Sequence, residues 1–163
     1  MDSTEAIYRG IKNAGIDFIV TVPCINLKKL IEMVEEDDEI VHVPVTREEE
    51  GLGICAGAYL AGKKTGILMQ NSGLGNSINA LTSLYELYSL PIVMIVSHRG
   101  TKGEPIIGQV PMGKATPELL ESIAINYEKI NNPKEAEHAV TSSWEKSESL
   151  KKPVALLFDI NYW

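Results

Sequence analysis

The chain has little of what disulfide scaffolds, metal sites and membrane proteins are built from. Its 163 residues include two cysteines, and Cys24 and Cys55 form neither a CxxC pair nor a cysteine–histidine pattern with metal-ligand spacing. No apolar run approaches the roughly 20 residues of a membrane span, and the amino terminus lacks the basic and apolar regions of a signal peptide. We therefore expect a cytoplasmic protein with free thiols, no metal ligands of its own and no membrane contact.

Positive charge is also scarce, because 15 basic residues face 22 acidic ones and the formal net charge is −7. Nucleic-acid binding needs a dense stripe of Lys and Arg, so nucleic acid is not an expected partner. Low-complexity tracts, which are typical of disordered chains, are missing as well. With 44% hydrophobic residues and the length of one domain, the chain is expected to form one globular domain over residues 1–163.

What the sequence does contain is a regular alternation of short apolar runs and amphipathic segments. The short, β-branched runs predict strands at Phe18–Val22, Ile40–Val45, Gly66–Gln70, Pro91–Val96 and Val154–Phe158, with a further short strand near Tyr127–Ile130. Strands that are apolar on both faces and alternate with helices indicate a mainly parallel sheet covered on both sides. The predicted fold class is a three-layer, doubly wound α/β domain.

The helices are predicted from apolar spacing together with capping residues. The first runs from an Asp2 cap to a Gly15 stop, and the later ones cover about Leu27–Val34, Glu48–Ala61 and Gly75–Tyr88. Two more follow, one capped by Thr116 with Pro117 at its first position and one opened by Asn132. Residues Ser97 to Lys114 are rich in glycine and proline and are predicted to form a long loop, which in a compact domain is typically functional or mobile.

Parallel sheets place ligands at the carboxyl ends of their strands, and four polar segments of this chain follow predicted strands. They are Pro23–Asn26, Thr46–Glu48, Asn71–Gly73 and Ser97–Arg99. Cations gather after the Pro91–Val96 strand, at His98, Arg99, Lys102 and Lys114. In an acidic protein this gathering favours a small anionic ligand, although a solvated surface loop explains any one of these residues equally well.

Three consecutive acids, Glu48 to Glu50, stand at a predicted strand-to-helix junction. Helix capping explains any one of them, because acids in a first turn are stabilised against the helix dipole. Capping does not explain the glycines that follow in the same helix at 51, 53 and 57. Each interior glycine costs roughly 1 kcal/mol relative to alanine, so a close approach by another helix, a flat ligand or a partner chain is expected here.

Three segments carry a family resemblance: Val22–Leu27, Thr46–Glu48 leading into Gly53–Ala61, and Met69–Asn76 with the sequence MQNSGLGN. They resemble the pyrimidine-binding domain of thiamine diphosphate-dependent decarboxylases, and within that family the branch that acts on sulfopyruvate and phosphonopyruvate. The resemblance runs from the first helix to the last strand. It implies a 2-oxo acid decarboxylase with thiamine diphosphate as cofactor.

The resemblance also implies roles for individual residues. In this family a glutamate hydrogen-bonds the N1′ nitrogen of the cofactor's aminopyrimidine ring and favours the tautomer that takes the proton from thiazolium C2. Glu48 stands at the matching position, with Glu49 one residue out of register and Glu50 two. Pro23, Asn71, Ser72 and Gly73 are the further residues expected to bind the cofactor.

One family feature is missing, because no Gly-Asp-Gly sequence occurs in the chain. In full-length members that motif holds magnesium and the diphosphate. The resemblance therefore implies a split enzyme, in which this chain supplies the activating carboxylate and a beta subunit binds Mg²⁺ and the diphosphate. The cofactor would then be shared at the interface of a hetero-oligomer.

For the substrate's second anionic group, such as a sulfonate, we expect Arg99 with Lys102 or Lys114, and we expect Asn26 and Gln109 to orient the substrate. Three alternatives stay open at this point. They are a subunit acting on phosphonopyruvate or another 2-oxo acid, a non-catalytic scaffold subunit, and a flavodoxin-like nucleotide-binding domain.

Overall fold

Six parallel strands form the centre of the molecule in the computed structural model, which describes residues 2–163. The strands are β1 (Phe18–Thr21), β2 (Val41–Pro44), β3 (Thr65–Gln70), β4 (Ile92–His98), β5 (Asn126–Ile130) and β6 (Pro153–Asp159). They are ordered β2-β1-β3-β4-β6-β5, and every neighbouring pair is parallel. The predicted parallel sheet is confirmed, including the short strand near Tyr127–Ile130.

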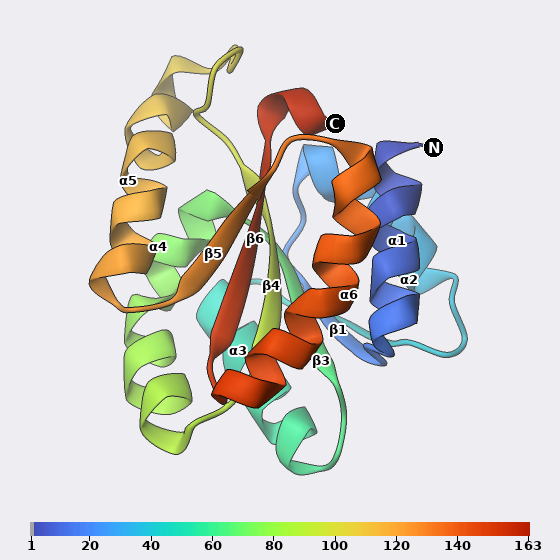
Figure 1. The fold of residues 1–163 in the computed structure, drawn as a ribbon. Coiled ribbons are helices and arrows are strands. Elements are labelled where there is room, and N and C mark those ends of the chain that lie inside the picture. The colour runs from blue at the N-terminus through green and yellow to red at the C-terminus, as the bar shows by residue number, and fades with distance from the viewer. Residues whose placement is uncertain (1) are drawn as a thin grey trace.

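Helices cover both faces of the sheet (Figure 1). One layer holds α1 (Ser3–Ala14), α2 (Lys28–Glu35) and α6 (Pro133–Leu150), and the other holds α3 (Glu48–Leu60), α4 (Asn71–Ala80), the π-helical turn η2 (Leu81–Glu86) and α5 (Val110–Ser122). Successive residues of β4 alternate between them, with Val93 and Ile95 in the first core and Met94 in the second. The three-layer fold class is therefore confirmed. Among residues 2–163, no helix is both long and apolar enough to cross a membrane.

The first helix follows its sequence signals closely. The Asp2 carboxylate accepts hydrogen bonds from the backbone amides of Thr4 and Glu5, and Gly15 ends the helix with φ of 69°, a conformation that suits glycine. Within α1, Gly10 lies against α6, where an added Cβ would stand 2.6 Å from the Cβ of Val140. This close approach seats α1 beside α6 (Figure 1).

Two helices begin earlier than predicted. Helix α4 starts at Asn71, directly after β3, although its first turn contains glycines that disfavour helix. The segment from Ser97 to Lys114 is not one loop, because β4 extends to His98, a 3₁₀ turn forms at Ile107–Gln109 and α5 starts at Val110. Packing against the sheet overrides local propensity in both places.

The predicted cap at Thr116 is wrong, since Thr116 and Pro117 lie inside α5. A proline within a helix leaves the carbonyl four residues earlier without its usual amide partner. That carbonyl belongs to Gly113, and it accepts a hydrogen bond from His98 Nε2 at 2.9 Å. The ring of His98, only 2% of whose surface is exposed, thus compensates for Pro117 and ties the end of β4 to α5.

The strand order creates a topological switch point at the carboxyl edge of the sheet, which we call the switch-point edge. Strand β1 lies between β2 and β3, so the chain leaves it first toward one edge and then returns to the other side. Ligands of open α/β sheets bind at such a switch point. The segments after β1, β2, β3 and β4 all meet at this edge and include the polar groups singled out from the sequence.

Two helical glycines provide a test of this packing. We expect Gly113→Ala to lower the free energy of unfolding by about 2 kcal/mol, because its Cβ would stand 2.5 Å from the Arg99 carbonyl oxygen and 2.6 Å from the backbone of Gly100. Gly57→Ala on α3 should instead raise it by roughly 0.5–1 kcal/mol, because no atom lies within 4 Å of its Cβ. Urea unfolding of the two variants measures both, and equal effects would contradict the packing described.

Candidate active site

Only one of the three consecutive acids is buried. Glu48 is the first residue of α3 and is 7% exposed, whereas Glu50 lies at the surface within 3.4 Å of the Thr46 hydroxyl. Glu49 turns the other way and pairs with Arg47, whose Nε donates to its carboxylate at 2.5 Å. A hydrogen bond from the backbone amide of Glu49 and a second from the guanidinium of Arg47 hold the pKa of the Glu49 carboxyl below its usual value. The geometry therefore distinguishes one buried carboxylate, Glu48, from a half-buried one that is bonded to Arg47 and an exposed one.

The Glu48 carboxylate lies against the first turn of α4. A Cβ atom at Gly73 would overlap the carboxyl carbon and one oxygen of Glu48, so only glycine leaves room for the acid there. The other oxygen, Oε2, accepts a hydrogen bond from Asn76 Nδ2 at 3.5 Å. The amino-terminal turn of a helix carries partial positive charge, which favours an anion at this position.

Asn71 and Thr116 form a buried hydrogen-bonded pair at the switch-point edge. The Asn71 amide donates to the Arg99 carbonyl at 3.1 Å and to the Thr116 hydroxyl at 2.9 Å, and its oxygen accepts from the Arg99 backbone amide at 3.0 Å. Both side chains are 0% exposed. Sequence reasoning assigned Asn71 to the cofactor, but the structure places its side chain between the end of β4 and α5 with its polar atoms already bonded.

Arg99 is held in a buried ion pair. Its Nε and Nη2 donate to the two carboxylate oxygens of Glu104 at 2.7 and 2.6 Å, and the two side chains are 7% and 1% exposed. The same carboxylate also accepts from the backbone amides of Gly100 and Ile106 at 3.0 and 3.1 Å. Hydrogen bonding to Arg99 lowers the pKa of Glu104 from 4.5 to about 2. The guanidinium predicted to meet the substrate's anion is therefore already matched by a carboxylate of its own loop.

The remaining predicted site residues lie around the same edge. Asn26 Nδ2 donates to the Ser97 hydroxyl at 3.1 Å, and Gln109 Oε1 accepts from Gln70 Nε2 at 3.1 Å. Lys102 and Lys114 are exposed. The structure thus brings Asn26, Ser72, Gly73 and Gln109 to the switch-point edge, on the segments that follow β1, β3 and β4. Sequence reasoning missed Gln70, Glu104 and Thr116, of which only Gln70 carried a signal, as the last residue of a central strand.

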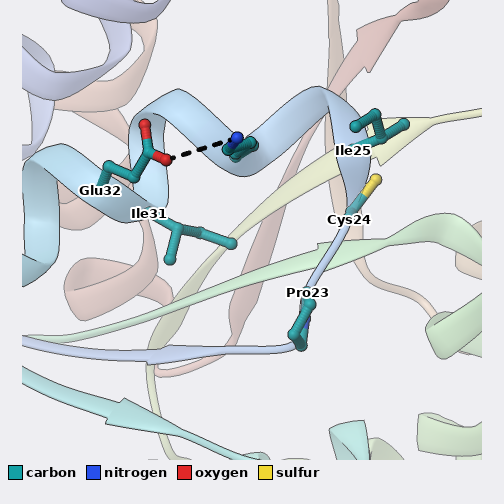
Figure 2. Close-up of a pocket in the computed structure, with 6 residues that line it drawn as sticks. Pro23, Cys24, Ile25, Ile31 and Glu32 are labelled. Atoms are coloured by element: carbon teal, nitrogen blue, oxygen red, sulfur yellow. Dashed lines mark ion pairs between the residues drawn. The ribbon is translucent and has the colours of Figure 1, made fainter.

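A cavity of about 440 Å³ opens beside Pro23, between the segment after β1 and helix α2 (Figure 2). Its wall is mostly apolar, with Cys24, Ile25 and Ile31 facing it, and the Lys28–Glu32 ion pair at 3.8 Å lies along α2. Glu48 is not among the residues that line this cavity. Pro23 and Cys24 line this cavity, and the Cys24 thiol also donates a hydrogen bond to Gln70 at the switch-point edge.

Comparison with known proteins identifies the family of the chain. Residues 1–124 match the family model described as thiamine pyrophosphate enzyme, N-terminal TPP binding domain. The chain therefore belongs to the thiamine pyrophosphate enzyme family. Among solved structures, the 2-oxoglutarate:ferredoxin oxidoreductase from Magnetococcus marinus superposes with a TM-score of 0.78 at 17% identity, over 99% of this chain and 29% of that one. At that identity the likeness concerns the fold.

Within the family, the chain groups with the alpha subunits of sulfopyruvate decarboxylase. It is 56% identical over 163 residues to the one from Methanothermobacter thermautotrophicus, covering 100% of this chain and 99% of that one. It is 43% identical over 123 residues to the sulfopyruvate decarboxylase of Methanosarcina acetivorans. That alignment covers 76% of this chain but only 31% of that protein. A phosphonopyruvate decarboxylase from Streptomyces viridochromogenes is more distant, at 39% over 113 residues, with 69% of this chain and 28% of that protein covered.

The Glu104 ion pair gives the loop after β4 a pH-dependent stability. Because the folded-state pKa of Glu104 is lowered to about 2, its stabilisation is complete above the ordinary pKa of 4.5 and is lost as pH falls from there toward 2. We expect Glu104→Gln to cost about 3 kcal/mol at pH 7, the typical cost of breaking a buried pair.

Urea unfolding between pH 7 and pH 3 measures this effect. The difference between the wild type and Glu104→Gln should shrink as pH falls below about 4.5. Glu118→Gln, at an exposed position of α5, serves as the matched control and should change stability little at any pH. A difference for Glu104→Gln that does not depend on pH would contradict this account of the ion pair.

Proposed function

We propose that the chain is the alpha subunit of a thiamine diphosphate-dependent decarboxylase that converts 3-sulfopyruvate to sulfoacetaldehyde and carbon dioxide, a step of coenzyme M biosynthesis. The observation that carries this proposal is the buried Glu48 carboxylate at the sheet's switch point, in a chain whose full-length relatives bear the name of that subunit. When bound, thiamine diphosphate supplies the electron sink that a departing carboxylate needs. A scaffold subunit would have no use for an acid that is buried with so few partners.

The residues around Glu48 fit an aminopyrimidine ring. The carboxylate accepts one long hydrogen bond, from Asn76, and a carboxylate has about four lone-pair sites, so it retains capacity to bond a ring nitrogen. Gly73 provides the space in which the acid lies. Ser72 and Pro23 stand on the neighbouring segments and would flank the ring, while Asn71 contributes through the position it gives to the β4–α5 connection.

Glu48 itself has two tasks in this proposal, to hold a proton at the ring nitrogen N1′ and to orient the ring. A charged hydrogen bond is worth more where water is excluded, because the local dielectric is low. Burial of Glu48 at the start of α3, against the first turn of α4, meets that requirement. The two neighbouring acids differ from it, since Glu50 is exposed and Glu49 is only half-buried and is already bonded to Arg47.

A partner subunit completes the site. The exposed side of α3 shows a stripe of small residues followed by an apolar end: an added Cβ at Gly53 or Gly57 would meet no atom within 4 Å, and Leu60 is 75% exposed. Leu87 and Tyr88, which follow η2, are also exposed. We propose that a beta subunit packs on this face and holds Mg²⁺ and the cofactor's diphosphate, so that the enzyme is a hetero-oligomer. The alpha-subunit names of the relatives support this.

The substrate's oxyanions are assigned to the segments after β1 and β4. Lys102 and Lys114 offer exposed positive charge there, and Asn26 and Gln109 offer amides. Arg99 lies on the same segment, but its guanidinium is paired with Glu104. Sulfopyruvate is favoured over phosphonopyruvate because the sulfopyruvate relatives match the whole chain and at higher identity.

The central test is Glu48→Gln in the complex of this chain with its beta subunit. Turnover of sulfopyruvate should fall at least about 100-fold, because the amide can no longer hold the proton at N1′, while co-purification of the two subunits stays unchanged. Glu49→Gln and Glu50→Gln are the matched controls and should keep most of the activity. Full activity of Glu48→Gln would indicate that the chain is a non-catalytic scaffold subunit. Loss of activity only in Glu49→Gln would indicate that Glu49 is the catalytic acid.

A second test moves the acid without replacing it. Gly73→Ala should lower kcat by at least about 10-fold, because its Cβ would take the space of the Glu48 carboxyl group. Gly75→Ala lies in the same turn, where the nearest atom to its Cβ is Met112 Cε at 3.8 Å, and should leave kcat nearly unchanged. Steady-state kinetics of the assembled enzyme measures both, and equal effects of the two variants would show that helix propensity, not the position of Glu48, matters here.

A further inference from the structure

Gln70 connects three segments of the switch-point edge. Neither the MQNSGLGN motif nor the family resemblance assigned it a role. It is the last residue of β3, next to the switch point. Its amide nitrogen Nε2 donates to the Ser72 hydroxyl at 2.9 Å and to Gln109 Oε1 at 3.1 Å. Its oxygen Oε1 accepts from the Cys24 thiol at 3.7 Å. One side chain thus contacts the segments that follow β1, β3 and β4.

The direction of these hydrogen bonds determines which groups of Ser72 and Gln109 remain free. An amide nitrogen carries two N–H groups, and Gln70 donates one to Ser72 and one to Gln109. Both neighbours therefore act as acceptors toward Gln70. The Gln109 amide presents its oxygen to Gln70 and so must turn its own NH₂ group away from it.

The Ser72 hydroxyl likewise accepts a hydrogen bond from Gln70. A hydroxyl that accepts a bond through its oxygen still has its proton to donate. Over residues 2–163, neither the Ser72 proton nor the Gln109 NH₂ group donates to a protein acceptor. Ser72 is exposed and Gln109 is half-buried, so both groups are accessible. The switch-point edge therefore offers two unused hydrogen-bond donors, and donors of this kind recognise oxyanions.

We propose that Gln70 is a positioning residue that sets Gln109 and Ser72 as paired donors for an oxyanion of the substrate. Neutral donors matter here because the guanidinium of Arg99 is already bonded to Glu104. This inference rests on the proposed function for the identity of the substrate. An oxyanion of the cofactor's diphosphate has the same chemistry, and the measurements below separate the two sources.

The test is Gln70→Glu in the complete alpha–beta complex. Glutamate has nearly the same shape but brings no N–H group, so Gln109 and Ser72 would have to turn their donors toward it and present acceptors to the ligand. The KM for sulfopyruvate should rise at least 10-fold with kcat changed less than 3-fold, and the half-saturating concentration of thiamine diphosphate should not move. Gln70→Met, which removes the donors without attracting those of the neighbours, should raise KM only about 3-fold.

Asn79→Asp is the matched control, since it adds the same charge at an exposed position of α4, and its KM should equal that of the wild type. An unchanged KM in Gln70→Glu, a loss confined to kcat, or a change confined to thiamine diphosphate would overturn the inference. If Gln70→Glu does not assemble, Gln70→Met decides: a raised KM at unchanged kcat supports the inference, and an unchanged KM overturns it.

A binding measurement separates this inference from the proposed function. Sulfoacetate carries a carboxylate and a sulfonate but has no 2-oxo group to react, and calorimetric titration of the complex with it requires no turnover. Gln70→Glu should weaken this binding at least 10-fold, and Glu48→Gln should not. If the complex fails to decarboxylate sulfopyruvate, the proposed function fails, while a selective effect of Gln70→Glu on sulfoacetate still supports donor positioning. Equal binding by the wild type and Gln70→Glu overturns it.

Discussion

The site depends on one steric constraint, the contact between the Glu48 carboxyl group and Gly73. The acid opens α3 and the glycine lies in the first turn of α4, so the two helices can meet only if position 73 has no side chain. That contact takes the carboxylate out of water and places it at a helix amino terminus. Everything proposed about cofactor activation requires an acid held in this way.

Around that contact, the carboxyl edge of the sheet is built from polar side chains that bond to one another. Asn71 holds the end of β4 against Thr116, and Glu104 holds Arg99 together with two backbone amides. Side chains of the types used for ligand binding are thus partly used to order the connections. Fewer polar groups remain free to bind a ligand. Gln70 determines that two of them, on Ser72 and Gln109, are hydrogen-bond donors.

Errors of the sequence-based prediction fall where tertiary contacts replace local ones. The helix after β4 was predicted to start at Thr116 because Pro117 is typical of a first turn. In the structure the helix continues through Pro117, because His98 bonds the carbonyl of Gly113 that the proline leaves free. A histidine 15 residues away from that carbonyl gives no signal to a capping rule.

The sheet, the layers and the position of the acidic cluster could be predicted from the amino-acid sequence, because they follow from the alternation of apolar runs and helical spacing along the chain. It also carried the resemblance that the family match bears out. The folded chain was needed to show that Glu48 is the most buried of the three acids, that Arg99 is paired, and that Gln70 joins three segments. These are properties of contacts between residues distant in sequence, and local patterns do not encode such distances.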